Sequence, residues 1–313
     1  MQSRRGILAT GLLAGLAVGC RGRRGSGKPK VAVSIFPLYD LARRIAGDRL
    51  DVVLVLPPGR SEHSFDPTPR EMARIAGARL ALGVGLGMDE WLARIVRSAG
   101  GDTTEIFDLG PQLDPRDVSG EDVGEDAADE ARDAQDAGAE HHEHGPKDPH
   151  VWLDPLRMVR AAELIARKFT QLDPAGAAGF AQRSAVLERS LRMLDAEIAQ
   201  HRAGWTRTKI VTFHGSMSYF AVRYHLQIVA VVEPFPGREP TARYLAEVLR
   251  ALENAGAAAL FSEPQLDRRP AQVIADQSHL PLFEIDPVGG VPGRDSYELL
   301  MRHNVSVLDR ALR

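Results

Sequence analysis

Four residues that can bind a metal ion stand at the ends of predicted strands or of a long loop. His63, His214 and Asp286 each follow an apolar run typical of a strand, and His150 ends a polar loop. Singly, a loop histidine is more often solvated, and an aspartate at a strand end usually caps a turn. Ligands of open α/β sheets, however, bind beyond the carboxyl ends of the strands. Three imidazoles and one carboxylate form the ligand set that tetrahedral Zn²⁺ favours, so together they predict a zinc site.

Short β-branched runs alternate with amphipathic segments through most of the chain, in two series. Because a helix between two strands returns the chain across the sheet, this alternation indicates parallel strands. We therefore expect an α/β fold of two lobes, each a mostly parallel β-sheet flanked by helices. The expected strands are 31–36, 50–56, 81–84 and 103–109, then 209–213, 226–232, 257–262 and 280–285, and the first series has helices at 38–46, 69–78 and 88–98.

Two long helical segments separate the two series. Asp154 suits the N-cap of the first and Pro155 its first turn. The second, residues 177–202, contains neither proline nor glycine except Gly179. A helix of ~25 residues spans nearly 40 Å, which is long enough to join the two lobes as one rigid rod.

The N-terminus has the features of an export signal. Arg4 and Arg5 precede a thirteen-residue apolar run, 7–19. Such a run spans only about 20 Å as a helix, less than the roughly 30 Å of a bilayer core, so we do not expect a permanent membrane span. The sequence of residues 3–8 also resembles a twin-arginine signal, which leaves the export route open.

Cys20 is the only cysteine, so no disulfide can form within the chain. The preceding residues 16–19 resemble the lipobox of bacterial lipoproteins, with leucine one step earlier than usual. The resemblance implies lipidation of Cys20 and a membrane anchor; the alternative is a secreted protein with an incidental cysteine. The glycine- and arginine-rich residues 21–28 would then form a tether.

An acidic insertion interrupts the first series. Residues 114–140 hold eleven acids and two bases, which predicts a solvated, disordered loop. The loop ends in His141, His142 and His144, which either collect zinc for the main site or only add solubility. The expected organisation is a signal at 1–19, a lipidated cysteine and tether at 20–29, a first lobe at 30–155 with the loop at 114–147, a helical connector at 156–206 and a second lobe at 207–313.

Three motifs resemble the zinc-specific members of the metal-binding solute receptors of ABC-type importers. They are residues 61–69 (SEHSFDPTP), 148–155 (DPHVWLDP) and 213–220 (FHGSMSYF), accompanied by 261–265 and 284–287. The likeness covers nearly the whole mature chain. It implies an exported receptor, at the periplasmic or extracellular face, that hands Zn(II) to the permease of an importer.

By this resemblance the zinc ligands are His63, His150, His214 and Asp286, with Glu62 as an alternative carboxylate. Manganese receptors of the family carry glutamate at the third position, so His214 favours zinc. Neighbouring residues have supporting roles: Glu263 lies beside the ligands, Asp154 is a helix cap, and Trp152, Phe65, Tyr219 and Phe220 either line the cleft or belong to the core.

Other functions fit less well. A zinc hydrolase needs an open coordination position and a general base such as Glu62, and no hydrolase motif is present, so we do not expect an enzyme. A manganese receptor and a surface adhesin remain alternatives. The net charge of −3 gives no reason to expect a nucleic-acid partner. We expect a monomer.

Overall fold

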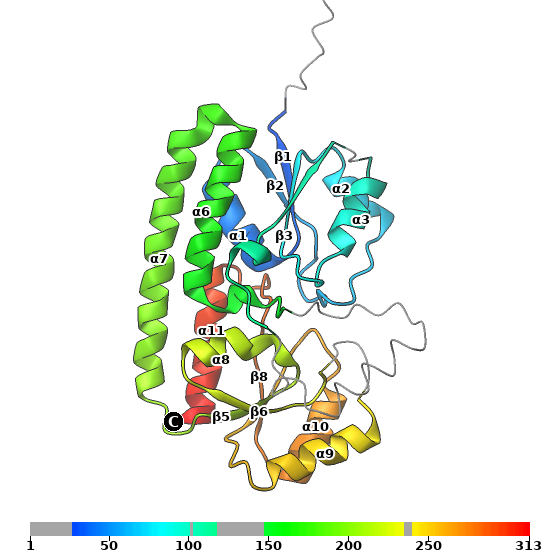
Figure 1. Cartoon of the computed structure of the whole chain (residues 1–313), viewed down its shortest axis with the longest axis vertical. Coiled ribbons are helices and arrows are strands. Elements are labelled where there is room, and N and C mark those ends of the chain that lie inside the picture. The colour runs from blue at the N-terminus through cyan, green and yellow to red at the C-terminus, as the bar shows by residue number, and fades with distance from the viewer. Residues whose placement is uncertain (1–26, 101–102, 118–146, 235–239) are drawn as a thin grey trace, which may run out of the picture.

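The computed structural model describes residues 27–100, 103–117, 147–234 and 240–313, and within them it contains two four-stranded parallel sheets (Figure 1). Both sheets have the same order, β2-β1-β3-β4 and β6-β5-β7-β8. The expected α/β fold of two lobes is thereby confirmed. The strands are β1 Lys30–Val33, β2 Asp51–Leu54, β3 Leu80–Gly83, β4 Glu105–Asp108, β5 Lys209–Thr212, β6 Gln227–Val231, β7 Leu260–Ser262 and β8 Leu282–Glu284.

The order of each sheet creates a topological switch point. After β1 the chain adds β2 on one side, then crosses to add β3 on the other, and the second sheet repeats this path around β5. The loops that leave β1 and β3, and those that leave β5 and β7, therefore diverge at the carboxyl edge and leave a crevice there. Residues just beyond these strands are placed to meet a ligand.

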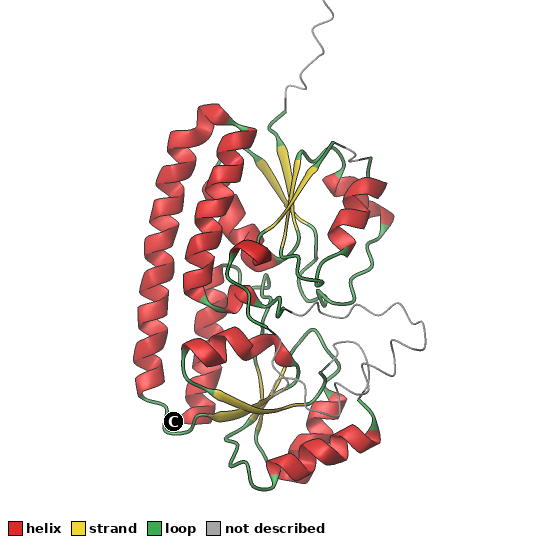
Figure 2. Cartoon of the chain, viewed as in Figure 1, coloured by secondary structure: helices red, strands yellow, loops and turns green. Residues whose placement is uncertain are grey.

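Helices flank both sheets (Figure 2). The first lobe contains α1 Phe36–Ala46, α2 Pro69–Ile75, α3 Trp91–Ser98 and the 3-10 turn η1 Gly110–Gln112. The second contains the turn η4 Gly215–Met217, α8 Ser218–Arg223, α9 Ala242–Leu252, α10 Arg269–Ser278 and α11 Tyr297–Leu312. Local signals fix several helix ends; Thr68, for example, forms a capping box with Glu71 at the start of α2.

Two long helices connect the lobes. The turn η2 Val151–Leu153 leads into α6 Pro155–Leu172, and the turn η3 Pro174–Gly176 leads into α7 Ala177–Ala203. Asp154 caps α6 by accepting the N–H of Leu156, as expected. With 27 residues α7 is about 40 Å long, and it runs beside both lobes in Figure 1.

Helix α7 is bound to both lobes by its arginines. Near its start, Arg183 donates to the carbonyls of Ile45 and Ala46 at the end of α1. Near its end, Arg202 donates to the carbonyl of Tyr224 in the second lobe. The helix therefore sets the spacing of the two lobes as a strut with a fixed contact at each end.

The core is continuous across the lobes. One apolar cluster includes Val33 of β1, Phe169 of α6, Leu191 of α7 and Met301 of α11. A smaller cluster fills the space between the second sheet and helices α9 and α10. Because close-packed interiors resist deformation, the continuous cluster makes the two lobes one stiff body.

A buried ionic contact also joins the lobes beside α7. Glu298 of α11 pairs with Arg44 of α1, at 2.8 Å between Oε2 and Nη1, and accepts the Ser190 hydroxyl of α7 at 2.7 Å. Asp40 of α1 accepts the N–H of Tyr297, the first residue of α11, at 3.0 Å. The end of the second lobe is thus fastened to the first helix of the first lobe.

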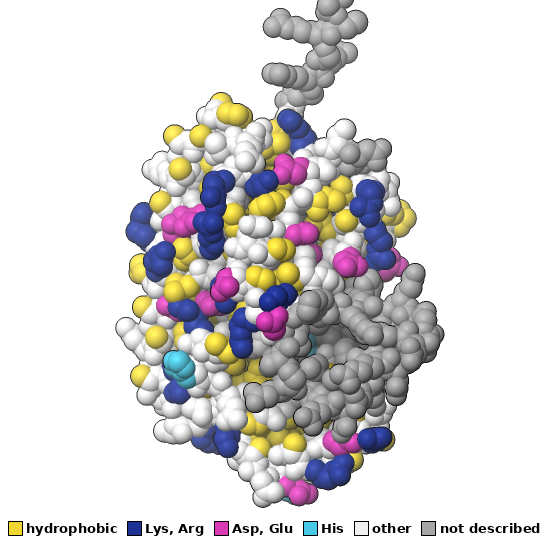
Figure 3. Space-filling view, in the orientation of Figure 1, with side chains coloured by type: hydrophobic (Ala, Val, Ile, Leu, Met, Phe, Trp, Pro, Cys, Tyr) yellow, Lys and Arg dark blue, Asp and Glu magenta, His cyan; other side chains and the backbone are white. Residues whose placement is uncertain are grey.

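Several sequence predictions concern residues outside the described part of the chain. These are the export signal 1–19, Cys20, most of the tether, and the loop histidines His141, His142 and His144. No helix of the described residues is long and apolar enough to cross a membrane. On the face shown in Figure 3, basic and acidic side chains are interspersed, consistent with a net charge of −3.

Candidate metal centre

Three histidines bring their Nε2 atoms together between the two lobes. The Nε2 of His63 lies 3.3 Å from that of His214 and 3.4 Å from that of His150, and the last two lie 3.2 Å apart. His63 belongs to the loop after β2, His150 immediately precedes η2, and His214 lies two residues beyond β5 and immediately precedes η4. All three side chains are buried. The predicted histidine set therefore converges on one point from three distant parts of the chain.

Carboxylates hold the opposite nitrogens of two of these rings. His150 Nδ1 is hydrogen-bonded to Asp148 Oδ1 at 2.8 Å, and His214 Nδ1 lies 2.8 Å from Glu263 Oε1. A carboxylate beside Nδ1 keeps the proton on that nitrogen, so the lone pair of Nε2 faces inward. The inward nitrogens of His150 and His214 are therefore both acceptors.

With both imidazoles neutral, this arrangement favours a cation between the rings. Two acceptor nitrogens 3.2 Å apart repel each other unless a positive centre lies between them. Four-coordinate zinc with bonds of about 2.0–2.1 Å holds its nitrogen ligands about 3.3–3.4 Å apart, from the geometry of a tetrahedron. The three observed separations, 3.2 to 3.4 Å, agree with that spacing. The residues present thus fit a zinc ion.

Glu62 supplies a fourth donor. Its Oε1 lies 3.5 Å from His63 Nε2, and this buried oxygen has no hydrogen-bond partner among the described residues. The donor atoms of Glu62 and the three histidines all lie within 4.8 Å of one another. The backbone of Glu62 is held by Trp91, whose Nε1 donates to its carbonyl at 2.9 Å. Buried charged groups in proteins are normally paired or coordinate a metal, so a buried carboxylate oxygen without a hydrogen bond, beside three imidazoles, fits a metal ligand.

The electrostatics of the centre also favour a cation. Burial raises the pKa of Glu62 to about 7, an effect that His214 partly opposes. For His214, burial is the largest influence and lowers the pKa, but the neighbouring carboxylates, chiefly Glu263, outweigh it and leave the pKa raised. Asp148 has a lowered pKa: burial raises it, but the contacts with His150 and Ser218 dominate. The centre therefore concentrates negative charge that a divalent ion would neutralise.

Asp286, the predicted fourth ligand, lies outside the four-residue group. Its Oδ2 lies 3.0 Å from Arg294 Nη1, and its Oδ1 accepts Gln265 Nε2 at 2.7 Å and two backbone N–H groups. These contacts use the carboxylate to hold the turn after β8. The sequence offered two carboxylates as the fourth ligand, Asp286 and, as the alternative, Glu62. The structure brings Glu62 to the histidines.

The predicted supporting aromatics have different positions. Trp152 is fully buried, its ring centre lies 5.2 Å from that of His150, and its Nε1 donates to Pro287 O across the lobes at 2.7 Å. Phe65 packs against Trp91 and Phe220 against Tyr224, so these two belong to the core. Trp152 is the aromatic that shields the centre.

Two supporting interactions were not predicted. From the sequence, Asp148 had no role beyond its place in a motif. In the structure, its Oδ1 accepts hydrogen bonds from the backbone N–H and from Nδ1 of His150. Ser216 donates to Glu263 Oε1 at 2.7 Å and so orients the carboxylate beside His214. The contact of Asp148 with His150 has a local signal in the sequence, an aspartate two residues before a candidate ligand with a proline between them. That spacing lets the carboxylate reach the backbone N–H of the ligand.

The remaining described histidines lie apart from the centre. His201 of α7 is hydrogen-bonded to Asp309 at 2.7 Å, while His225 and His279 occupy left-handed backbone positions that end helices. His303 lies within α11.

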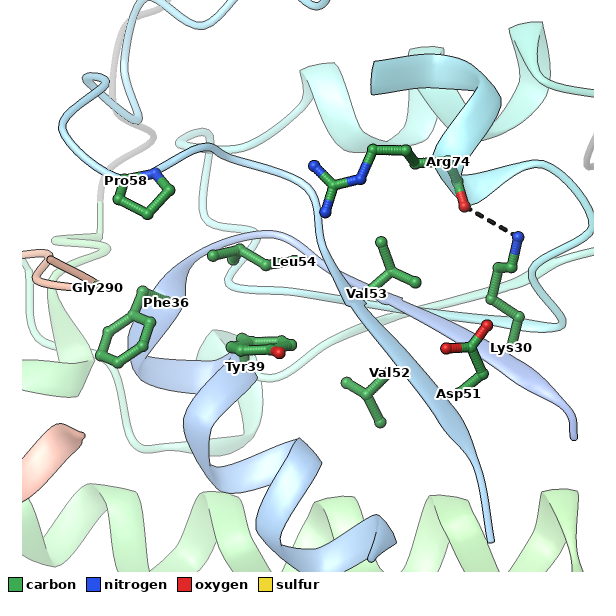
Figure 4. A pocket seen from close by; sticks show the side chains of 10 residues that line it. All are labelled: Lys30, Phe36, Tyr39, Asp51, Val52, Val53, Leu54, Pro58, Arg74 and Gly290. Atoms are coloured by element: carbon green, nitrogen blue, oxygen red, sulfur yellow. Dashed lines mark hydrogen bonds between the residues drawn. The ribbon is translucent and has the colours of Figure 1, made fainter. Parts of the chain in front are cut away.

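A pocket of about 440 Å³ at the edge of the first sheet is a different kind of site (Figure 4). Val52, Val53 and Leu54 of the edge strand β2 form one wall, and Lys30 closes one end by donating to Arg74 O at 2.9 Å. Its lining contains no histidine and one carboxylate, Asp51. It therefore lacks the ligand set of the histidine centre.

Comparison with known proteins gives a consistent picture. The family model described as "Zinc-uptake complex component A periplasmic" matches residues 31–311. The curated "Zinc-binding protein AdcA" of Streptococcus pyogenes serotype M3 is 25% identical over 291 residues, which cover 90% of this chain. "Metal ABC transporter substrate-binding lipoprotein FimA" of Streptococcus parasanguinis is 24% identical over 299 residues, 92% of this chain and 90% of its own.

The relatives differ from this chain in length and in sequence. The matched region is 56% of the AdcA relative, so this chain spans little more than half the length of that protein. Among solved structures, the "Crystal structure of ZnuA" has a TM-score of 0.76 at 22% identity and covers 92% of this chain and 100% of its own. At that identity the structural likeness shows a common fold.

Proposed function

Because the chain belongs to the family of periplasmic zinc-uptake component A proteins, we propose that it is an extracytoplasmic receptor that binds Zn²⁺ and delivers it to an ABC-type importer. One observation carries the proposal: the Nε2 atoms of His63, His150 and His214 lie 3.2 to 3.4 Å apart, and Asp148 and Glu263 orient the rings of His150 and His214. The printed names of relatives, a zinc-binding protein and a metal transporter lipoprotein, agree with it.

The proposed zinc ligands are His63, His150, His214 and Glu62. Imidazole is a borderline-soft ligand that suits zinc, whereas manganese prefers a larger share of oxygen donors. Asp286 lies close enough to raise the pKa of Glu62 and adds negative charge near the ion. Four protein donors leave no position for an attacking water, so the centre holds its ion as cargo.

The proposed context is the outer face of a membrane. Cys20 would carry the lipid, and residues 21–29 would tether the first lobe, whose first strand begins at Lys30. The permease would receive zinc from the crevice between the two lobes. We assign the first lobe to residues 30–155, the second lobe to residues 207–313, and the helical connector between them to residues 156–206. In the proposed scheme, His141, His142 and His144 collect zinc weakly, since ordering a loop around an ion costs entropy.

The first test is zinc content. The purified chain should hold about one zinc per molecule by elemental analysis, as one four-ligand centre requires. His214→Ala and His150→Ala should lose it, while His201→Ala, a histidine paired with Asp309 away from the centre, should retain it. Zinc retention by His214→Ala, or a wild-type chain that never binds zinc, would refute the proposal.

The second test separates a transport receptor from an adhesin or a manganese receptor. Zinc uptake by cells that lack the chain should be restored by the wild type and not by His214→Ala. Uptake that does not depend on the chain would favour the adhesin. If the chain prefers manganese to zinc in a direct competition titration, it is a manganese receptor.

A further inference from the structure

Tyr219, near the start of α8, contacts both chain segments that flank the acidic insertion. Its hydroxyl accepts the N–H of Arg116 at 3.0 Å and donates to the carbonyl of Asp148 at 2.8 Å. The side chain is 2% exposed. One phenol therefore holds a residue from before the insertion and another from after it.

The two flanking segments form a paired stem. The N–H of Asp148 donates to Arg116 O at 2.9 Å, and Asp117 and Lys147 form an antiparallel bridge with an ion pair of 2.6 Å. The stem precedes α6 in the chain, whereas Tyr219 belongs to the second lobe. The contacts of Tyr219 thus cross from one side of the metal centre to the other.

Neighbouring contacts reinforce the same junction. Ser218, beside Tyr219, donates to the Asp148 carboxylate, and Arg116 Nη1 donates to Ser218 O at 3.3 Å. The guanidinium of Arg157 lies 4.9 Å from the centre of the Tyr219 ring and binds the carbonyls of Leu113 and Asp114 at the foot of the stem. Residues of α8 therefore bind both parts of Asp148: Tyr219 binds its backbone carbonyl and Ser218 binds its side chain.

Asp148 is also the residue that orients His150, through bonds to its N–H and its Nδ1. His150 and His214 lie on opposite sides of this junction, since His214 follows β5 in the second lobe, five residues before Tyr219. Their Nε2 atoms are 3.2 Å apart. The bonds of Tyr219 span the same gap as the proposed zinc ion would. We propose that Tyr219 is a positioning residue that latches the His150 segment to the second lobe and so slows the escape of bound zinc.

This latch rests on the proposed zinc-binding function, but it makes a distinct kinetic statement. The scheme needs only a local release of the His150 segment from α8 within the stiff body of the two lobes. Zinc enters while that segment is released, and it leaves only when the segment breaks the latch with zinc bound. Loss of the hydroxyl leaves the Arg116 N–H and the Asp148 carbonyl without that partner. The latch should therefore affect the dissociation rate of zinc more than its association rate.

The test compares Tyr219→Phe with Tyr224→Phe. Phenylalanine keeps the ring at both positions; Tyr224 donates its hydroxyl to Asp195 at 3.0 Å and is a matched structural control. With zinc alone as probe and a chelator chase, zinc should dissociate about tenfold faster from Tyr219→Phe, because stranding buried partners shifts an equilibrium by roughly five- to a hundredfold. Association should change less than about twofold if the latch acts on exit alone.

A second readout needs no zinc. In the metal-free chain the amide hydrogens of residues 113–117 and 147–151 should exchange faster in Tyr219→Phe and remain unchanged in Tyr224→Phe. Dissociation within twofold of the wild type, or equal acceleration in both variants, would overturn the latch. A wild type that fails to bind zinc would refute the proposed function, and unchanged amide exchange would then overturn the latch independently.

Discussion

Arg294 Nη1 lies 3.0 Å from Asp286 Oδ2, and this contact engages the carboxylate that the sequence favoured as the fourth zinc ligand. Asp286 is 1% exposed and also accepts the N–H groups of Val288 and Gly289, so its oxygens are already used by its own turn. Glu62 Oε1, in contrast, is buried beside His63 without a hydrogen bond among the described residues. The two carboxylates thus differ in what zinc must displace to reach them.

The first prediction ranks these two residues. Glu62→Gln should weaken zinc binding by at least about tenfold, because it removes a charged ligand, whereas Asp286→Asn should have a smaller effect. Competition with a chromophoric chelator measures both affinities. A larger loss in Asp286→Asn would mean that Asp286 leaves Arg294 when zinc binds and acts as the fourth ligand.

The second prediction concerns pH. The pKa of Glu62 is raised to about 7 and that of His214 is raised above its ordinary value, so in the metal-free protein both bind protons that zinc must expel. Affinity should therefore rise with pH through about 7, by roughly ten- to a hundredfold per unit, and level off once both groups have lost their protons. Calorimetry in buffers of different ionisation enthalpy counts the protons released.

A matched variant assigns one of these protons. In Glu62→Gln, zinc binding at pH 6 should release about one proton fewer than in the wild type, since the amide does not titrate in this range. An affinity that stays flat from pH 7 to pH 5 would contradict a site that combines histidines with Glu62.

The third prediction concerns the carboxylate that orients His150. Asp148→Asn should reduce zinc affinity by about 10- to 100-fold, the usual cost of losing the partner of a metal-bound histidine. The control is Asp309→Asn, which removes a similar carboxylate from His201, at 2.7 Å, outside the centre. If both variants bind zinc like the wild type, Asp148 does not set the orientation of His150.

The fold could be predicted from sequence in more detail than the site. Each of the eight expected strands overlaps an observed one because period and residue type are local signals, although most were predicted too long: residues 31–36, for example, run into the start of α1 at Phe36. Asp154 and Pro155 marked the start of α6 because capping is also a local signal. Of the three histidines that the structure brings together, His63 and His214 were candidates because they follow strands, and strand ends of a parallel sheet share one edge. His150 was a candidate at the end of the long loop. These inferences need no knowledge of side-chain contacts.

The choice between Glu62 and Asp286 could not be made in this way. It depends on whether the loop after β8 returns Arg294 to Asp286, and on the burial of Glu62 beneath residues from both lobes. Both are tertiary facts that follow from loop conformation and packing. The contact of Tyr219 with Asp148, between residues 71 positions apart, is hidden from sequence for the same reason.

The fourth prediction concerns the contact that fastens α11 to α1 and α7. Glu298→Gln should lower the free energy of unfolding by about 1–3 kcal/mol, because it weakens charged hydrogen bonds to Arg44 in a largely buried site. Chemical denaturation of the metal-free chain measures the change, and zinc content should remain the same.

The effect should depend on pH in a defined direction. Burial raises the pKa of Glu298, but the bonds from Arg44 and Ser190 outweigh it, so the pKa is lowered. A lowered pKa adds stability above the unfolded-state value, so the difference between wild type and Glu298→Gln should be full at pH 7 and shrink below about pH 4. Glu197→Gln is the matched control: it breaks a more exposed pair with Arg302 that joins α7 to α11 without α1, and it should cost less than about 1 kcal/mol. Equal losses in the two variants would show that the Arg44 contact has no special part in joining the lobes.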